Sequence, residues 1–414
     1  MMGEKPEPGG RRRARRTLVV IGGAGMMASG TIRDLVSNLS DAPDRIVVAD
    51  RDEAACRSLI DRLGDARLEA RAVDVGDRAA LAALLRGADW CLNGVPTFAG
   101  HQMTIFEACL EAGCHYVDYG GMGIYTTRQK AMHEAWRARG LTAIVSLGSD
   151  PGLSNVLCRA VADRLETIDR INLYWAAEVD GPPNPVLVPP YNVATLLAEY
   201  ANTSRQFLDG ALRDVPAQSG FETLDLPPPW GPTAFMFTQH SEPLTVPFAK
   251  GIGDKGIKEF TWKLHLPRED HDTWVGLIRA GFGDFDEPLE VNGATVKPAD
   301  VLAAIVARNI KKRAALIPER ESRELHFAIG HGRQGGLPAK VTCTATLVPS
   351  ALHEGYLDAA TAMCASVGLQ LAMRRTPEAG VWAPEEAFNP AVFFAELRRR
   401  GFEIALTTEV TDTP

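Results

Sequence analysis

Apolar runs alternate with helix-patterned segments over the first 150 residues. The run Leu18–Ile21 predicts a strand buried on both faces, and a glycine turn and a segment of helical periodicity follow it. Further expected strands end at Asp50 and lie at 68–75, 88–96, 113–118 and 141–148. Expected helices lie at 52–63, 78–85, 102–112 and 127–139. This order predicts an α/β fold with a doubly wound parallel sheet, a Rossmann fold, over residues 17–150.

The pattern changes beyond Gly148, where period-two alternation becomes common. Strands are expected at 171–178, 244–248, 259–266, 323–328 and 340–346, and helices after Asp150-Pro151-Gly152 and at 195–200 and 357–371. Residues 151–374 are therefore expected to form a second α/β domain with a mainly antiparallel sheet. Residues 1–16, which carry an arginine cluster, are expected to be a disordered basic tail.

The turn after the first strand has the chemistry of a dinucleotide cradle. Gly22 and Gly23 allow the chain to leave the strand through dihedral angles that a side chain would forbid, and Gly25 lets the pyrophosphate approach the backbone. Ala28 keeps the following helix close to the sheet. The free amides at the helix start, at Met26 and Met27, then face the phosphates. The flanking strand, the helix and the acid about 25 residues further on all agree with this interpretation.

The end of the second strand bears on the choice of cofactor. Asp50 is placed to bind a ribose diol, which favours NAD, whereas Arg51 could pair with the 2′-phosphate of NADP. Both cofactors stay open, with NAD preferred. The other strand ends are expected to line the same crevice, since ligands bind beyond the carboxyl ends of parallel strands. These expected crevice residues are Asp74, Val75, Asn93, Val95, Pro96, Asp118, Tyr119 and Gly148.

Composition narrows the class of protein. A length of 414 residues suits two domains. A net charge of −8 gives no reason to expect binding to nucleic acid or a membrane, and no apolar run approaches the roughly 18 residues of a membrane helix. The seven cysteines are scattered without zinc-finger spacing, and no metal cluster is evident. These features predict a cytoplasmic protein with reduced thiols and no metal.

With these pieces placed, the chain resembles the saccharopine dehydrogenase family, in particular its saccharopine reductase and lysine 6-dehydrogenase branch. The matching segments are spread along most of the chain: the turn at 22–28, ACLEAGCHYVDYGG (108–121), GSDPGLSN (148–155), HSEPLTVP (240–247), GIKEFTWKL (256–264) and GVWAPEEAFNPAVFFAELRRRG (380–401). The resemblance implies that about 375–414 rejoin the Rossmann domain. It implies that 151–374 bind substrate and form a homodimer. It also implies NAD(P)-dependent hydride transfer at the C–N bond of a small amine or amino acid.

Candidate catalytic residues follow from the chemistry of such a reaction. His240 is the preferred proton carrier, because an imidazole titrates near neutral pH. Glu242 could bind the substrate ammonium, and Ser241 could hydrogen-bond it. Asp118 could anchor the ammonium or brace the backbone. A histidine in a loop is more often a surface or capping group. The assignment of His240 as the proton carrier therefore depends largely on the family resemblance.

Further substrate contacts are expected in the loop that opens the second domain. Asp150 could be a ligand or the N-cap of the helix after it, with Pro151 in the first turn. Gly148 and Gly152 would permit close approach to the nicotinamide, and Lys255 could pair with a substrate carboxylate. Two other classes stay open: an NAD(P)-dependent reductase of a C=O or C=C group, and a nucleotide sensor without catalytic activity.

Overall fold

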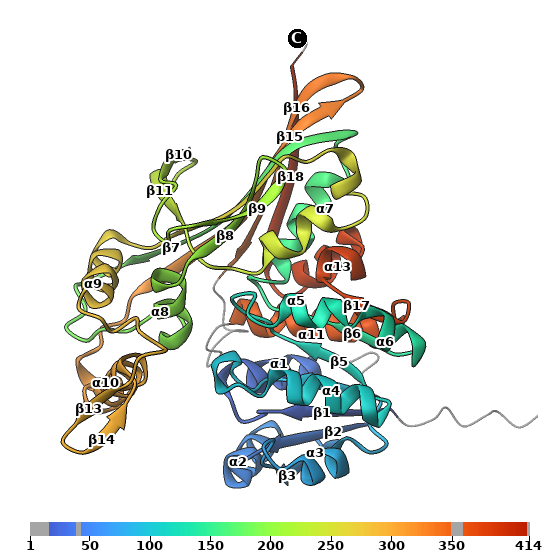
Figure 1. Ribbon diagram of the computed structural model, residues 1–414, viewed down its shortest axis with the longest axis vertical. Coiled ribbons are helices and arrows are strands. Elements are labelled where there is room, and N and C mark those ends of the chain that lie inside the picture. Colours follow the sequence, from blue (N-terminus) through green and yellow to red (C-terminus); the bar gives the residue numbers. More distant parts are fainter. Residues whose placement is uncertain (1–15, 39–42, 349–358, 412–414) are drawn as a thin grey trace, which may run out of the picture.

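The computed structural model describes residues 16–38, 43–348 and 359–411, which form two large sheets with their covering helices and one two-stranded sheet (Figure 1). Most of the expected tail, residues 1–15, lies outside the described residues. Arg16 is anchored, which corrects the expected boundary of the tail. Its amide donates to the Asp44 carboxylate at 2.8 Å and its guanidinium donates to the Met373 carbonyl at 2.6 Å.

The first sheet has seven parallel strands in the order β17-β6-β5-β4-β1-β2-β3, which confirms the expected Rossmann fold. Alternate residues of β1 are buried on opposite faces: Leu18 and Val20 pack in one apolar cluster, Val19 and Ile21 in another. Helices on both faces therefore explain the continuous apolar run. The strands are β1 Thr17–Ile21, β2 Arg45–Asp50, β3 Leu68–Ala72, β4 Trp90–Asn93, β5 His115–Asp118, β6 Thr142–Ile144 and β17 Gly380–Trp382. The helices of this domain are α1 Met26–Ser37, α2 Glu53–Leu63, α3 Arg78–Leu85, η1 Thr97–Ala99, α4 Gln102–Ala112, α5 Thr126–Ala131, α6 His133–Ala138 and α11 Ala359–Arg374.

The second sheet has nine strands, seven of them in the order β10-β11-β12-β7-β15-β16-β18, with β8 and β9 attached beside β12. Pairing is antiparallel except between β12 and β7. The sheet is therefore mixed, and the expectation of a mainly antiparallel sheet is confirmed. The strands are β7 Thr167–Asp180, β8 Ser204–Leu208, β9 Ala211–Val215, β10 Glu222–Leu226, β11 Gly231–Phe237, β12 Glu259–His265, β15 Glu321–Gln334, β16 Leu337–Leu347 and β18 Phe402–Val410.

Helices α7 (Leu153–Ala162) and α13 (Pro390–Arg398) pack against the second sheet beside the Rossmann domain (Figure 1). At the other end of this sheet, α8 (Val193–Ala201) packs against α9 (Arg268–Arg279) and α10 (Pro298–Lys312). The remaining elements are η2 Glu242–Leu244, η3 Val246–Phe248, η4 Gly253–Lys255, β13 Leu289–Val291, β14 Ala294–Val296, η5 Ala314–Leu316 and α12 Pro384–Ala387.

One expectation about these segments is wrong, and another holds only in part. Residues 244–248 form the 3-10 turns η2 and η3 instead of a strand, because Pro243 and Pro247 lack the amide that a strand would donate. The last segment is also shared between the domains. β17 joins the first sheet beside β6, but β18 pairs with β16 in the second sheet, and α11 already packs against α1 before residue 375. The expected return of 375–414 to the Rossmann domain therefore holds for part of that segment.

Candidate active site

The glycine turn after β1 has no room for side chains. Gly22 has a φ of +70°, and a Cβ there would lie 2.8 Å from the carbonyl carbon of Gly94. A Cβ on Gly23 would lie 2.6 Å from Val48 Cγ1. Gly25 is the N-cap of α1, and its amide donates to the Gly22 carbonyl at 2.9 Å. The turn therefore brings bare backbone and the start of a helix together, as a dinucleotide pyrophosphate requires.

Ala28 has the close-packing role expected for it. A Cβ added to Gly94 would lie 2.9 Å from the Ala28 methyl group. α1 thus approaches the loop after β4 so closely that both positions need small residues.

Asp50 ends β2 beside the glycine turn. One carboxylate oxygen accepts from the Ala24 amide at 3.3 Å and the other from the Asp52 amide at 3.2 Å. Arg51 is exposed. Asp74, one strand further out, accepts from the Gly76 amide at 2.9 Å. These side chains lie where the ribose and adenine of a dinucleotide would lie in this fold.

A cavity of about 1290 Å³ joins this crevice to the second domain. It runs from Gly22 past the strand ends at Asn93 and Gly148 to the second sheet. Twelve of the thirteen residues expected to bind the cofactor line it, Gly23 being the exception. The residues present in the crevice therefore fit a nicotinamide dinucleotide.

One face of the second sheet forms the floor of this cavity. Alternate residues of neighbouring strands point into it, as the two-residue period of a strand requires. Trp175 and Ala177 come from β7, and the register sets them opposite His326 and Glu324 of β15. Trp262 comes from β12, on the far side of β7. The floor is therefore aromatic with one acid in it.

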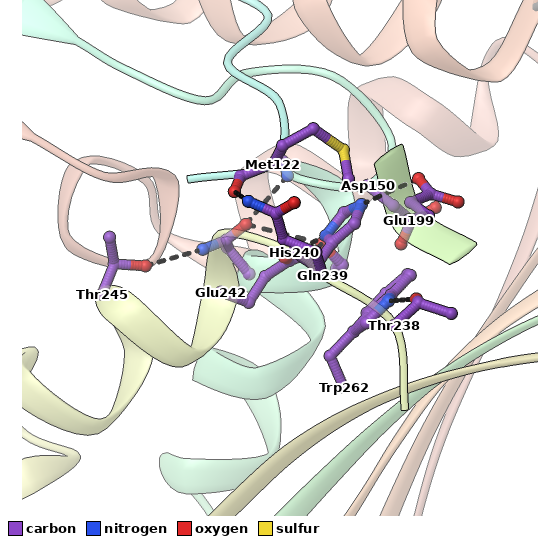
Figure 2. Close-up of polar contacts among 12 residues, drawn as sticks. Met122, Asp150, Glu199, Thr238, Gln239, His240, Glu242, Thr245 and Trp262 are labelled. Carbon is purple, nitrogen blue, oxygen red and sulfur yellow. Dashed lines mark hydrogen bonds and ion pairs between the residues drawn. The ribbon is translucent and has the colours of Figure 1, made fainter. Parts of the chain in front are cut away.

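His240 lies between two carboxylates in a buried wall of the cavity (Figure 2). Its Nδ1 pairs with Glu242, and its Nε2 lies 3.9 Å from Glu199 Oε1. Its ring stacks on Trp262 with centroids 4.0 Å apart at 14°. Burial alone would lower the pKa of His240, but the carboxylates of Glu242, Glu199 and Asp150 outweigh it and raise that pKa.

Glu199 is a site residue that the sequence analysis missed. It is 3% exposed and accepts a hydrogen bond from the Tyr191 hydroxyl. Burial raises its pKa to about 7, against the opposing effects of His240 and Tyr191. A signal was present, since Glu199 is the one charged residue in the apolar helix VATLLAEYA (α8) and is buried there with its neighbours.

A second buried ion pair lies beneath the loop that enters α7. His326 Nδ1 is 2.5 Å from Asp150 Oδ2, and its Nε2 is 3.5 Å from Glu324 Oε2. Burial would lower the pKa of His326, but Asp150 and Glu324 raise it to about 10. Trp175 donates to Glu324 at 3.2 Å. Asp150 is not the N-cap of α7, because Gly152 holds that position. The Asp150 carboxylate is paired with His326 instead.

Asp118 braces the strand ends. Its Oδ2 accepts from Gln102, Gln129 and the Tyr116 hydroxyl at 2.7, 2.7 and 2.8 Å, and its Oδ1 accepts from the Ser146 amide at 2.8 Å. It borders the cavity but is 1% exposed. With four donors already bound, its carboxylate suits the bracing alternative better than an ammonium anchor.

Four other expected site residues lie outside the cavity lining. Lys255 donates to the carbonyls of Ala162 and Leu165 at 2.7 and 2.8 Å, so it satisfies the end of α7 and does not serve as a carboxylate ligand. A Cβ on Gly152 would lie 2.0 Å from the Gly148 carbonyl oxygen, so Gly152 permits a tight loop. Ser241 is buried away from the cavity. Glu242, 0% exposed, binds His240 and accepts from Ser154 at 2.7 Å. Tyr119, Pro151 and Asp150 do line the cavity.

The carboxylates grouped around His240 suit a cation, while Arg320 and Arg323 also line the cavity. Three carboxylates, Glu199, Asp150 and Glu324, line the cavity beside His240, with Glu242 and His326 directly behind. Aromatic faces and buried carboxylates are the groups that recognise an ammonium ion.

Comparison with known proteins finds one matching family model, over part of the chain. Residues 18–144 match the saccharopine dehydrogenase NADP binding domain. Carboxynorspermidine synthase from Vibrio cholerae is 25% identical over 301 residues, which span 64% of this chain and 67% of that protein. Its counterpart from Vibrio alginolyticus is 23% identical over the same shares.

Among solved structures, apo saccharopine dehydrogenase (L-Glu forming) from Saccharomyces cerevisiae has a TM-score of 0.70 at 13% identity. The match covers 95% of this chain and 100% of that chain. At that identity the likeness shows the fold alone. No helix within the described residues is long and apolar enough to cross a bilayer. The expected resemblance is confirmed: residues 18–144 match the saccharopine dehydrogenase NADP binding domain, and the whole chain shares the fold of saccharopine dehydrogenase.

Proposed function

We propose that this protein interconverts an amine and an imine with a nicotinamide dinucleotide. The main support is that one cavity extends from the glycine turn to the carboxylates around His240. A C–N oxidoreductase needs these two parts together: a cradle that holds the nicotinamide and an acidic pocket that holds the ammonium.

The chain's own groups would divide the work as follows. The bare turn at Gly22 and the start of α1 hold the pyrophosphate. Asp150, whose Oδ1 is buried without a hydrogen-bond partner within the described chain, accepts from the substrate nitrogen. Trp175 and Trp262 exclude water from the reacting carbon. The nicotinamide, when bound, would accept or donate the hydride.

We infer NAD as the cofactor. The support is Asp50, which is fixed at the end of β2 by two backbone amides and lies where a ribose diol would bind. NADP remains the alternative, because Arg51 is exposed beside it and the matching family is described as NADP binding.

The substrate class is supported by charge and by the relatives. The Vibrio proteins are carboxynorspermidine synthases, and carboxynorspermidine is a carboxylated polyamine that contains secondary amines. We propose a substrate of this kind, an amino acid or polyamine that bears a cationic nitrogen.

A substrate screen tests this function. Lysine, ornithine, saccharopine and carboxyspermidines, each with NAD and NADP, are followed at the nicotinamide absorbance, with ketones and enones in parallel for the reverse direction. We expect turnover with at least one amine. Reduction of a ketone or enone, with every amine and imine inactive, would refute the proposal.

We also propose a homodimer formed through the second domain, as the family resemblance implies. Apolar side chains are exposed at one end of the second sheet, namely Leu337 and Val410. Light scattering should give twice the chain mass of 44.8 kDa. A mass of one chain at micromolar concentration would contradict the dimer.

A further inference from the structure

The ring nitrogens of His240 both face carboxylates. Nδ1 pairs with Glu242, which is held from behind by Ser154, and Nε2 faces Glu199. The ring is 4% exposed and covered on one face by Trp262. Carboxylates at both nitrogens favour the protonated ring, and a protonated imidazole has no lone pair with which to take a proton from a substrate.

Glu199 is differently placed. It projects from α8 into the cavity, and one of its oxygens is bound by the Tyr191 hydroxyl while the other faces His240 (Figure 2). Its carboxylate can therefore gain or lose a proton while two fixed partners keep it in position. It is also the carboxylate nearest to Nε2 of His240, at 3.9 Å.

The groups that face Glu199 come from four segments. Tyr191 precedes α8, Tyr200 follows Glu199 within α8, Asp150 precedes α7, and His240 with Glu242 precedes or begins η2. Tyr191 and His240 favour the ionised carboxylate, whereas burial, Glu242 and Asp150 favour the protonated one. The balance leaves the pKa of Glu199 near 7, where a group can both accept and donate a proton.

We propose that Glu199, and not His240, exchanges the proton of the substrate amine, and that His240 and Glu242 are a positioning pair that holds Glu199. This inference rests on the proposed amine chemistry. It replaces the assignment made from the sequence, in which His240 was the proton carrier.

The step balances as follows. The ammonium form of the substrate gives one N–H proton to the Glu199 carboxylate and becomes a neutral amine. The amine carbon then loses its hydride to the oxidised nicotinamide, and the nitrogen lone pair forms the C=N bond of an iminium ion. The hydride carries two electrons away from the substrate. The Glu199 carboxylate takes one proton and ends as a carboxylic acid. The reverse direction returns both.

The first test needs no substrate. The infrared spectrum of the wild-type protein minus that of Glu199→Gln, taken across pH, isolates the carboxyl band of Glu199. Glu385, another buried carboxyl whose pKa is raised to about 7, is present in both proteins and cancels. We expect a protonated-carboxyl band that disappears with a midpoint near pH 7. A Glu199 carboxylate that stays ionised down to about pH 5 would overturn the proposal.

The second test uses the pH profile of kcat/KM for amine oxidation. In the wild type the value should rise as pH passes about 7, because Glu199 must be ionised. Glu199→Gln should lower kcat by about 100-fold or more and remove this limb. Tyr191→Phe, a milder change, should keep the limb but move it to higher pH, since a bond to the ionised form is lost. The control Glu409→Gln, at an exposed surface pair, should match the wild type.

His240→Gln decides between the two assignments. If Glu199 is the acid–base group, the limb persists in this variant and moves to higher pH, because a cation beside Glu199 is gone. If the limb is lost in His240→Gln and kept in Glu199→Gln, the proposal is wrong. If the wild type oxidises no amine at all, the proposed function fails, and the infrared titration still decides the state of Glu199.

Discussion

The buried pair of His326 and Asp150 predicts a loss of stability at alkaline pH. His326 is 0% exposed, and its imidazole lies 2.5 Å from Asp150 and 3.5 Å from Glu324. Its folded-state pKa of about 10 lies above the ordinary value of 6.5. A raised pKa stabilises the fold fully below pH 6.5, and this stabilisation is lost as pH rises towards 10.

The size of the effect follows from the width of that window. Each pKa unit corresponds to 1.36 kcal/mol, so the shift sets an upper limit of about 5 kcal/mol on the loss of unfolding free energy between pH 6.5 and 10. Removing one partner of a buried pair costs about 3–5 kcal/mol, which is the same range. We therefore expect His326→Gln to be destabilised by about 3 kcal/mol at pH 6.5 and to approach the wild type at high pH.

Urea unfolding of both proteins at several pH values between 6.5 and 10 measures this directly. His331→Gln is the matched control, because His331 lies on the same strand and its pKa is lowered by burial, so it stays neutral throughout the window. The wild type and the control should lose stability over this range, whereas His326→Gln should lose much less. The same pH dependence in all three proteins would refute the assignment of His326 as a buried cation.

Three further substitutions test the cradle and the second domain. Asp50→Ser should weaken NAD binding by about tenfold or more and shift the preference towards NADP, because a charged acceptor for the ribose is lost beside Arg51. Titration calorimetry with both cofactors measures this preference, and an unchanged preference would contradict the role of Asp50. Gly22→Ala should abolish cofactor binding measured in the same way, since its Cβ would overlap the Gly94 backbone at 2.8 Å, and wild-type affinity would show that the turn is not the cradle. Lys255→Met should reduce the unfolding free energy by about 1 kcal/mol and leave kcat/KM unchanged, since Lys255 binds two carbonyls at the end of α7; a raised KM would instead restore it as a substrate ligand.

The sequence was most informative in the Rossmann domain. There the glycine turn, the apolar run of β1 and the acid that ends β2 are local features with one geometric meaning, and residues near each strand end necessarily meet at one edge. Twelve of the thirteen expected cofactor residues accordingly line one cavity.

The substrate side of the site could be predicted only in part. Glu199, Glu324 and His326 come from α8 and β15, and they meet Asp150 and His240 only because the second sheet places α8 and β15 beside the α7 loop. No spacing along the chain encodes those contacts. Lys255 shows the opposite error. Its position near a motif suggested a substrate ligand, but its ammonium group donates to two carbonyls at the end of α7.

Isotope transfer shows whether the cofactor takes its hydride from the amine carbon. An amine substrate identified in the screen is labelled with deuterium at the carbon next to nitrogen and incubated with the protein and the oxidised cofactor, and the reduced cofactor is analysed by mass spectrometry. We expect one deuterium in the reduced nicotinamide for each imine formed with the wild type, and no labelled cofactor with Gly22→Ala. Reduced cofactor that forms without deuterium, or a failure of every labelled amine while a carbonyl or enone substrate is reduced, would contradict it.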